Sequence, residues 1–148
     1  MSNFSPFSGN RSARCIIVGA GDFFGLRRNP KHGDLLIAAD AGLCNIVKCG
    51  LTPDIILGDF DSLDSEDTID FTGDKISIKK PEIIRYPIEK DDTDMMLAVK
   101  EGLSRGFTEF DLYGGTGGRV DHLFANLQTL AFLSCRGASG RLYGENYI

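Results

Sequence analysis

The chain has 148 residues, of which 42% are apolar and 25% are charged, and its net charge is −5. This length and composition are typical of one globular domain with its own hydrophobic core. The acidic balance argues against a surface that tracks nucleic-acid phosphates, which would be basic, and the sequence holds no apolar run of membrane-spanning length.

The four cysteines are Cys15, Cys44, Cys49 and Cys135; they form no C-x-x-C pair, and the chain has two histidines. A zinc site is therefore not expected. Cys15 and Cys135 lie among apolar residues and are expected to act as small core residues. The sequence shows no signal-peptide pattern, which predicts a reducing, cytoplasmic setting. Residues 1–13, rich in Ser and Asn, are expected to form a flexible N-terminus.

Two apolar runs near the start predict the first two strands. The run Arg14–Val18 enters the glycine-rich stretch Gly19–Gly25, for which a plain turn and a ligand-binding loop are equally good interpretations. The run Asp34–Ala39 ends at Asp40, a carboxylate directly after a buried strand. Apolar residues at helical spacing then predict a short helix over residues 42–48.

A third strand, Ile55–Leu57, is followed by Gly58 and then by two carboxylates at a spacing of two, Asp59 and Asp61, with Ser62 next to them. Two like charges at the tip of a buried strand would repel each other unless a cation lay between them. Mg²⁺ is usually held by one or two carboxylates together with substrate phosphates. An acidic turn is the alternative interpretation, since Asp and Ser are common turn residues.

A fourth strand over residues 81–87 leads into an acidic segment and a helix. Either Asp92 or Thr93 is a suitable N-cap, and Asp94 suits the positive end of the helix. Helix capping could explain the carboxylates of Asp92 and Asp94. It does not explain why three of the four residues that follow Lys90 are acidic. The residues expected to share the packed face of this helix are Met96, Val99, Lys100 and Leu103.

A fifth strand, Glu109–Tyr113, enters a cluster of four glycines that is followed by a helix. Such a cluster lets backbone N–H groups approach an anion closely, and the helix completes the anion site. Arg119 and His122 come next; we favour ligand contact for the histidine over a structural role. The apolar residues expected on the packed face of the helix are Val120, Leu123, Phe124, Leu127, Leu130 and Ala131. Residues 140–143 predict a sixth strand.

Strands alternate with helices, which predicts an α/β fold over residues 14–143. We expect a mostly parallel, doubly wound, Rossmann-like sheet of about six strands with helices on both faces. The carboxyl ends of parallel strands meet at one edge of the sheet, where ligands bind. The glycine loops and acids that follow these strands would meet there, which suggests a site for a metal ion and a polyphosphate.

Together the motifs resemble the catalytic domain of thiamine pyrophosphokinase. The resemblance is carried by Asp40 and by residues 58–62, 91–94 and 114–122. It implies transfer of the pyrophosphoryl group of ATP to the thiamine hydroxyl, which gives thiamine diphosphate and AMP. It also implies that Asp59, Asp61 and Asp94 hold Mg²⁺, with Asp40 as a further catalytic acid. The residues it places at ATP are Ser62, Lys90, Asp92, Thr93, Gly114, Gly115, Gly117, Gly118, Arg119, Asp121, His122 and Asn126.

Members of that family carry a second, β-rich domain that supplies part of the thiamine site, generally across a dimer. Residues 144–148 would be its start, so we expect this chain to provide the ATP and Mg²⁺ side of the site. A homodimer is expected for the full-length enzyme. The candidates for the base that accepts the thiamine hydroxyl proton are Asp40 and Asp94. Two alternatives remain: a Mg²⁺-dependent phosphohydrolase with Asp59 as nucleophile, and a non-catalytic, nucleotide-binding regulatory domain.

Overall fold

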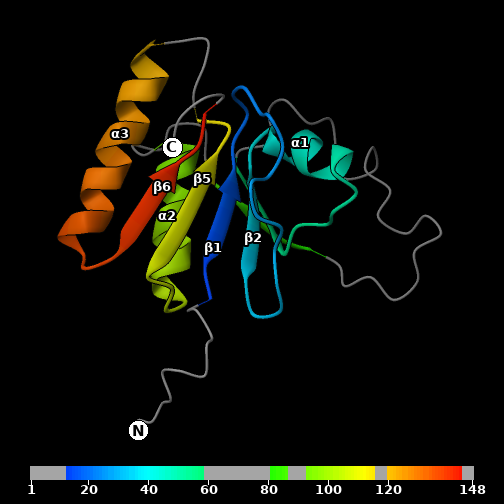
Figure 1. Ribbon diagram of the computed structural model, residues 1–148, viewed down its shortest axis with the longest axis horizontal. Coiled ribbons are helices and arrows are strands. Elements are labelled where there is room, and N and C mark those ends of the chain that lie inside the picture. The colour runs from blue at the N-terminus through cyan, green and yellow to red at the C-terminus, as the bar shows by residue number, and fades with distance from the viewer. Residues whose placement is uncertain (1–12, 59–80, 87–92, 116–119, 145–148) are drawn as a thin grey trace, which may run out of the picture.

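The computed structural model describes residues 13–58, 81–86, 93–115 and 120–144, with the backbone alone at 120–122. Figure 1 shows a sheet with helices packed around it. In chain order the elements are β1 (Cys15–Val18), β2 (Leu35–Ala39), α1 (Gly42–Lys48), β3 (Ile55–Gly58), β4 (Glu82–Arg85), α2 (Asp94–Ser104), β5 (Glu109–Tyr113), α3 (Val120–Cys135) and β6 (Ser139–Leu142).

Within these ranges the strands form one six-stranded sheet in the order β4-β3-β2-β1-β5-β6. Every neighbouring pair of strands in it is parallel. The predicted α/β class is thus confirmed, and the expected strand limits agree with the observed ones to within one or two residues. The central strands β1, β2, β3 and β5 are buried along nearly their whole length, as expected for a parallel sheet with both faces covered. The edge strands β4 and β6 are mostly exposed.

The two faces of the sheet carry separate hydrophobic clusters. Alternation along β1 sends Cys15 and Ile17 into the cluster that includes α2 and α3, and Ile16 and Val18 into the cluster that includes α1. Figure 1 shows α3 beside β6 and α1 at the other end of the sheet. The expectation of helices on both faces is therefore confirmed.

The connection from β1 to β2, residues 19–34, contains no helix. It crosses the same face as α1, where Phe23 and Leu26 pack against the cluster that contains Tyr113 and Tyr143. This part of the sheet is thus covered by an irregular segment, and polar contacts described below hold it in place.

The packed face of α2 differs from the prediction by about one residue. Its buried residues are Met95, Ala98, Val99 and Gly102, and Leu103 is partly buried against the same core, so the prediction is right for Val99 and Leu103 and wrong for Met96 and Lys100. A prediction based on large apolar residues overlooks small residues such as Ala98 and Gly102, at which the helix backbone can come closest to the sheet. A Cβ at Gly102 would lie 2.6 Å from Cε2 of Phe110, which shows how closely the helix backbone meets the sheet.

The packed face of α3 was also predicted incorrectly in part. Leu123 and Leu130 do pack against the core, but the side chains of Phe124 and Leu127 are 61% and 48% exposed. The residues of α3 that are buried instead are Asn126, Thr129 and Leu133. Because α3 lies at the end of the sheet, beside β6, one side of it has no neighbour among the described residues. Cys135 is exposed for the same reason, so its assignment to the core is wrong, whereas Cys15 is buried as predicted.

Candidate functional site

The order of the strands creates a switch point between β1 and β5. From β1 the chain proceeds outward through β2, β3 and β4 on one side, and β5 and β6 lie on the other side. In doubly wound sheets, ligands bind in the crevice at the carboxyl ends of the strands at such a point. The residues that follow β1 and β5, namely Gly19 and Gly114, are therefore the first to consider.

The turns after β1 and β5 are joined by backbone hydrogen bonds. The N–H of Gly19 donates to the carbonyl of Tyr113 at 2.7 Å, and the N–H of Gly21 donates to the carbonyl of Gly114, also at 2.7 Å. Gly114 has φ +72°, and a Cβ there would lie 2.4 Å from the carbonyl oxygen of Gly19. Only glycine fits this position, since it tolerates both the left-handed backbone and the close approach.

Asp40 lies directly after β2 in a backbone conformation that L-residues seldom adopt. Its φ is 53°, and its N–H donates to the carbonyl of Leu57 at 2.7 Å. A Cβ built on Gly58 would lie 3.5 Å from Oδ1 of Asp40, so this carboxylate is next to the end of β3. Left-handed backbone at a non-glycine residue is energetically costly and is concentrated at functional sites.

The start of α2 also lies at the carboxyl edge of the sheet. Thr93 is the N-cap, and its hydroxyl accepts the N–H of Met96 at 3.1 Å, which decides between the two predicted caps. Asp94 follows in the first turn. Cε of Met95 would lie 3.2 Å from a Cβ placed on Gly19, so the beginning of α2 packs against the turn that follows β1.

Asn126 of α3 is buried and holds the turn that follows β5. Its side-chain amide donates to the carbonyl of Gly115 at 2.8 Å. A Cβ at Gly115 would lie 2.7 Å from Nδ2 of Asn126, so this position also requires glycine. Asp121 and His122 fall in the first turn of α3 by their backbone.

The other predicted site residues lie outside the described ranges. They are Asp59, Asp61, Ser62, Lys90, Asp92, Gly117, Gly118 and Arg119, and the side chains of Asp121 and His122 are likewise outside them. Within the ranges that are described, no group of three or more His, Cys, Asp or Glu residues could hold a metal ion. Asp40 and Asp94 carry carboxylates, which are of the ligand type that Mg²⁺ prefers, and Gly58 of β3 is followed in the sequence by Asp59.

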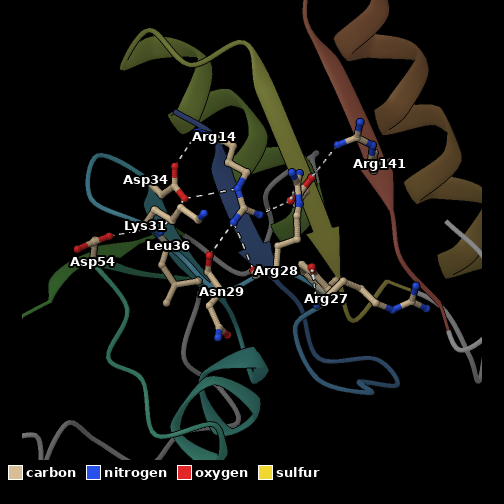
Figure 2. A network of polar contacts seen from close by, with 11 residues as sticks. Arg14, Arg27, Arg28, Asn29, Lys31, Asp34, Leu36, Asp54 and Arg141 are labelled. Carbon is tan, nitrogen blue, oxygen red and sulfur yellow. Dashed lines mark hydrogen bonds and ion pairs between the residues drawn. The ribbon is translucent and has the colours of Figure 1, made fainter. Parts of the chain in front are cut away.

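A buried ionic network, which was not predicted, ties the segment from β1 to β2 to the sheet. Arg14 is fully buried; it forms ion pairs with Asp34, at 3.4 Å, and with Asp111 in β5. Its guanidinium also donates to the carbonyls of Arg28 and Asn29. Figure 2 shows Arg14 between Asp34 on one side and Arg28 on the other. An Asp inside an apolar strand was the signal that could have revealed this pair.

Further contacts fix the same segment next to the switch point. Nη2 of Arg28 lies 3.3 Å from Oδ2 of Asp111, and the backbone N–H of Arg27 donates to the hydroxyl of Tyr113 at 3.0 Å. Tyr113 stacks on Tyr143 with ring centroids 4.5 Å apart. Burial raises the pKa of the Tyr113 hydroxyl above its ordinary value, so it stays neutral at physiological pH. Tyr113 immediately precedes Gly114, so these contacts also stabilise the position of the glycine turn.

The helices in the described part of the chain are too short or too polar to cross a membrane.

Comparison with known proteins identifies the family. Residues 26–138, more than half of the chain, match the family model described as thiamin pyrophosphokinase, catalytic domain. A curated relative, the thiamine pyrophosphokinase of Bacillus subtilis (strain 168), is 33% identical over 96 residues. That alignment covers 65% of this chain and 42% of the relative, so the aligned part spans less than half the length of the curated protein.

Solved structures agree with the family model. The thiamin pyrophosphokinase of Geobacillus thermodenitrificans superimposes with a TM-score of 0.68 at 29% identity, over 88% of this chain and 59% of that one. The thiamine pyrophosphokinase of Bacillus subtilis superimposes with a TM-score of 0.72 at 26% identity, over 88% and 60%. Neither the phosphohydrolase nor the regulatory-domain alternative is favoured by these matches. The chain therefore belongs to the family of thiamin pyrophosphokinase catalytic domains.

Proposed function

We propose that this chain performs the ATP-dependent step of a thiamine pyrophosphokinase, in which the pyrophosphoryl group of ATP passes to the thiamine hydroxyl. The observation that carries the proposal is that two joined glycine turns, Asp40 and the start of α2 lie at the carboxyl edge of a parallel sheet from this family. The products are thiamine diphosphate and AMP. ATP and thiamine are the proposed substrates, and a cytoplasmic homodimer is the proposed form of the whole enzyme.

The glycine turns are proposed to bind the phosphates. Close packing of Gly19 against Gly114 leaves no side chain between the backbone and the crevice, so backbone N–H groups can reach an anion. Further ATP contacts are proposed for Ser62, Lys90, Asp92, Thr93, Gly115, Gly117, Gly118, Arg119, Asp121, His122 and Asn126.

The carboxylates are proposed to hold magnesium. Asp59, Asp61 and Asp94 would be its ligands, with Asp40 beside them at the end of β3. When bound, Mg²⁺ neutralises the charge on the phosphate oxygens. The thiamine hydroxyl attacks the β-phosphorus, the bond from that phosphorus to the α-phosphate oxygen breaks, and AMP leaves. Asp40 or Asp94 is proposed to accept the hydroxyl proton. Such transfer depends mainly on positioning and charge neutralisation.

The test is product analysis with the purified chain, ATP, MgCl₂ and thiamine. Thiamine diphosphate and AMP are expected to form in equal amounts, and omission of thiamine should abolish AMP formation. Release of inorganic phosphate without thiamine would instead indicate a phosphohydrolase. ATP binding with no turnover, even when thiamine and a complete second domain are supplied, would indicate a regulatory module.

One variant tests the metal ligands by a binding measurement. Asp61→Asn is expected to keep the parental melting temperature and to lose the Mg²⁺-dependent part of ATP binding, because an amide is a much weaker ligand than a carboxylate. Calorimetric titration with ATP, with and without MgCl₂, measures this. Equal MgATP affinity in variant and parent would remove Asp61 from the metal site.

A further inference from the structure

The backbone carbonyl group of Gly19 is tightly packed at the switch point. A Cβ on Gly114 would lie 2.4 Å from its oxygen, and a Cβ on Gly42 would lie 2.8 Å from it. The side-chain amide of Asn45, in α1, donates to the same oxygen at 3.2 Å. Two glycines thus make room for this carbonyl, and one asparagine supplies its hydrogen-bond donor.

A fixed carbonyl also fixes the N–H that follows it. The peptide bond between Gly19 and Ala20 is trans and planar, so the N–H of Ala20 points opposite to the carbonyl of Gly19. The carbonyl faces α1, and therefore the N–H of Ala20 faces away from α1. Ala20 is exposed, and its N–H has no hydrogen-bond acceptor among the described residues. The neighbouring N–H groups of Gly19 and Gly21 are already occupied by Tyr113 and Gly114.

The same arrangement occurs a second time, after the other central strand. Asn126 of α3 donates to the carbonyl of Gly115 at 2.8 Å, and Gly115 has no room for a Cβ beside that amide. Asn45 and Asn126 come from helices on opposite faces of the sheet. α1 and α3 thus each hold one glycine turn through an asparagine side chain that donates to a glycine carbonyl. This repetition favours a common functional role for the two contacts over chance packing.

We infer that Asn45 is a positioning residue that holds the Gly19 carbonyl so that the Ala20 N–H donates to a nucleotide phosphate. This inference rests on the proposed function, because it places a phosphate donor on the β1 side of the proposed ATP site. Backbone N–H groups without internal acceptors are well suited to anions, since they carry partial positive charge and need no side chain. Asn45 does not touch the ligand in this arrangement; it acts through the backbone of Gly19.

The test combines nucleotide titration with a signal from Ala20 itself. MgATP should shift the Ala20 amide resonance of the ¹⁵N-labelled parent downfield, whereas adenosine, which lacks phosphate, should not shift it. Asn45→Ala is expected to weaken MgATP binding about tenfold by calorimetry, the loss that follows from one well-placed hydrogen bond. Ala is a better helix former than Asn, so the melting temperature should stay close to the parental value. Asn45→Asp, which puts a carboxylate against the carbonyl, should weaken binding at least as much.

Asn29→Ala is the matched control, because the structure uses the backbone carbonyl of Asn29 in the contact with Arg14. It should bind MgATP like the parent. Parental affinity in both Asn45 variants, or an Ala20 resonance that MgATP does not move, would overturn the inference and leave the proposed function standing. A parent chain that does not bind MgATP at all would overturn the proposed function together with the inference.

Discussion

Arg14 and Asp111 lie 97 positions apart in the sequence, yet they form a fully buried ion pair between the start of β1 and the middle of β5. Asp34 shares the same guanidinium, and the partly exposed side chains of Arg28 and Arg141 also approach Asp111. A buried charge is tolerated only with partners of opposite charge and satisfied hydrogen bonds. The pair therefore joins the irregular segment between β1 and β2 to the strand that carries the glycine turn.

Removal of one partner of this pair should be strongly destabilising. Asp111→Asn leaves the buried Arg14 guanidinium without its principal countercharge, and we expect the free energy of unfolding to fall by about 3 kcal/mol. Urea denaturation measures this. Replacing both Arg14 and Asp111 with Leu should recover part of the loss, because no unpaired charge then remains in the interior.

Arg141→Gln is the control for that experiment. Its guanidinium lies 4.0 Å from Asp111 and its side chain is 54% exposed, so its removal should change the free energy of unfolding by less than about 1 kcal/mol. If Asp111→Asn were as mild as Arg141→Gln, the buried pair would not be the contact that anchors the segment.

Gly114→Ala should separate backbone strain from steric conflict. The new Cβ would lie 2.4 Å from the Gly19 carbonyl oxygen, which is a steric clash. Alanine would also bear the energetic cost of the left-handed backbone at φ +72°. Gly137→Ala has a similar φ of +77° with nothing within 4 Å, so it should show the strain alone, about 1 kcal/mol. We expect Gly114→Ala to be clearly more destabilising than this control and to weaken MgATP binding. Similar unfolding free energies for the two variants would mean that the turns tolerate a side chain.

Asp40 should show opposite effects on stability and activity. Asp40→Gly removes the cost of the left-handed backbone at φ 53° and is expected to raise the free energy of unfolding by up to about 1 kcal/mol. Asp40→Asn keeps the side-chain shape and tolerance of that backbone but not the charge. Both variants should lower the rate of thiamine diphosphate formation at least tenfold. Parental rates in both would exclude a catalytic role for Asp40.

Cys15 should make stability depend on pH in the alkaline range. Burial raises the pKa of its thiol well above the ordinary value, so the folded protein keeps the proton while the unfolded chain loses it above about pH 8.5. The unfolded state then binds fewer protons, and the free energy of unfolding should fall as the pH rises from 8 to 10. Cys15→Ala should reduce this slope even though it lowers stability at neutral pH. Cys135→Ala, at an exposed position, should leave the slope unchanged.

Much of the fold could be predicted from local patterns in the sequence. Apolar runs such as Cys15–Val18 and Leu35–Ala39 form strands, and Thr93 caps α2, because these preferences act within a few residues of chain. The acids and glycines that follow the strands could be assigned to one edge for the same reason: all parallel strands point the same way. The glycine-rich stretch after β1 stayed ambiguous, since its hydrogen bonds go to Tyr113 and Gly114, far along the chain.

What only the tertiary structure decided is which side chains meet across long separations and which helix faces are covered. Phe124 and Cys135 belong to apolar patterns but lie exposed, because α3 packs at the end of the sheet. Asn45 looks like an ordinary helix residue until the order β2-β1-β5 brings α1 against the carbonyl of Gly19. Arg14 and Asp111 likewise become partners only when β1 and β5 pair. Local preference determines the elements, whereas burial and hydrogen bonding across the assembled sheet determine what each residue does.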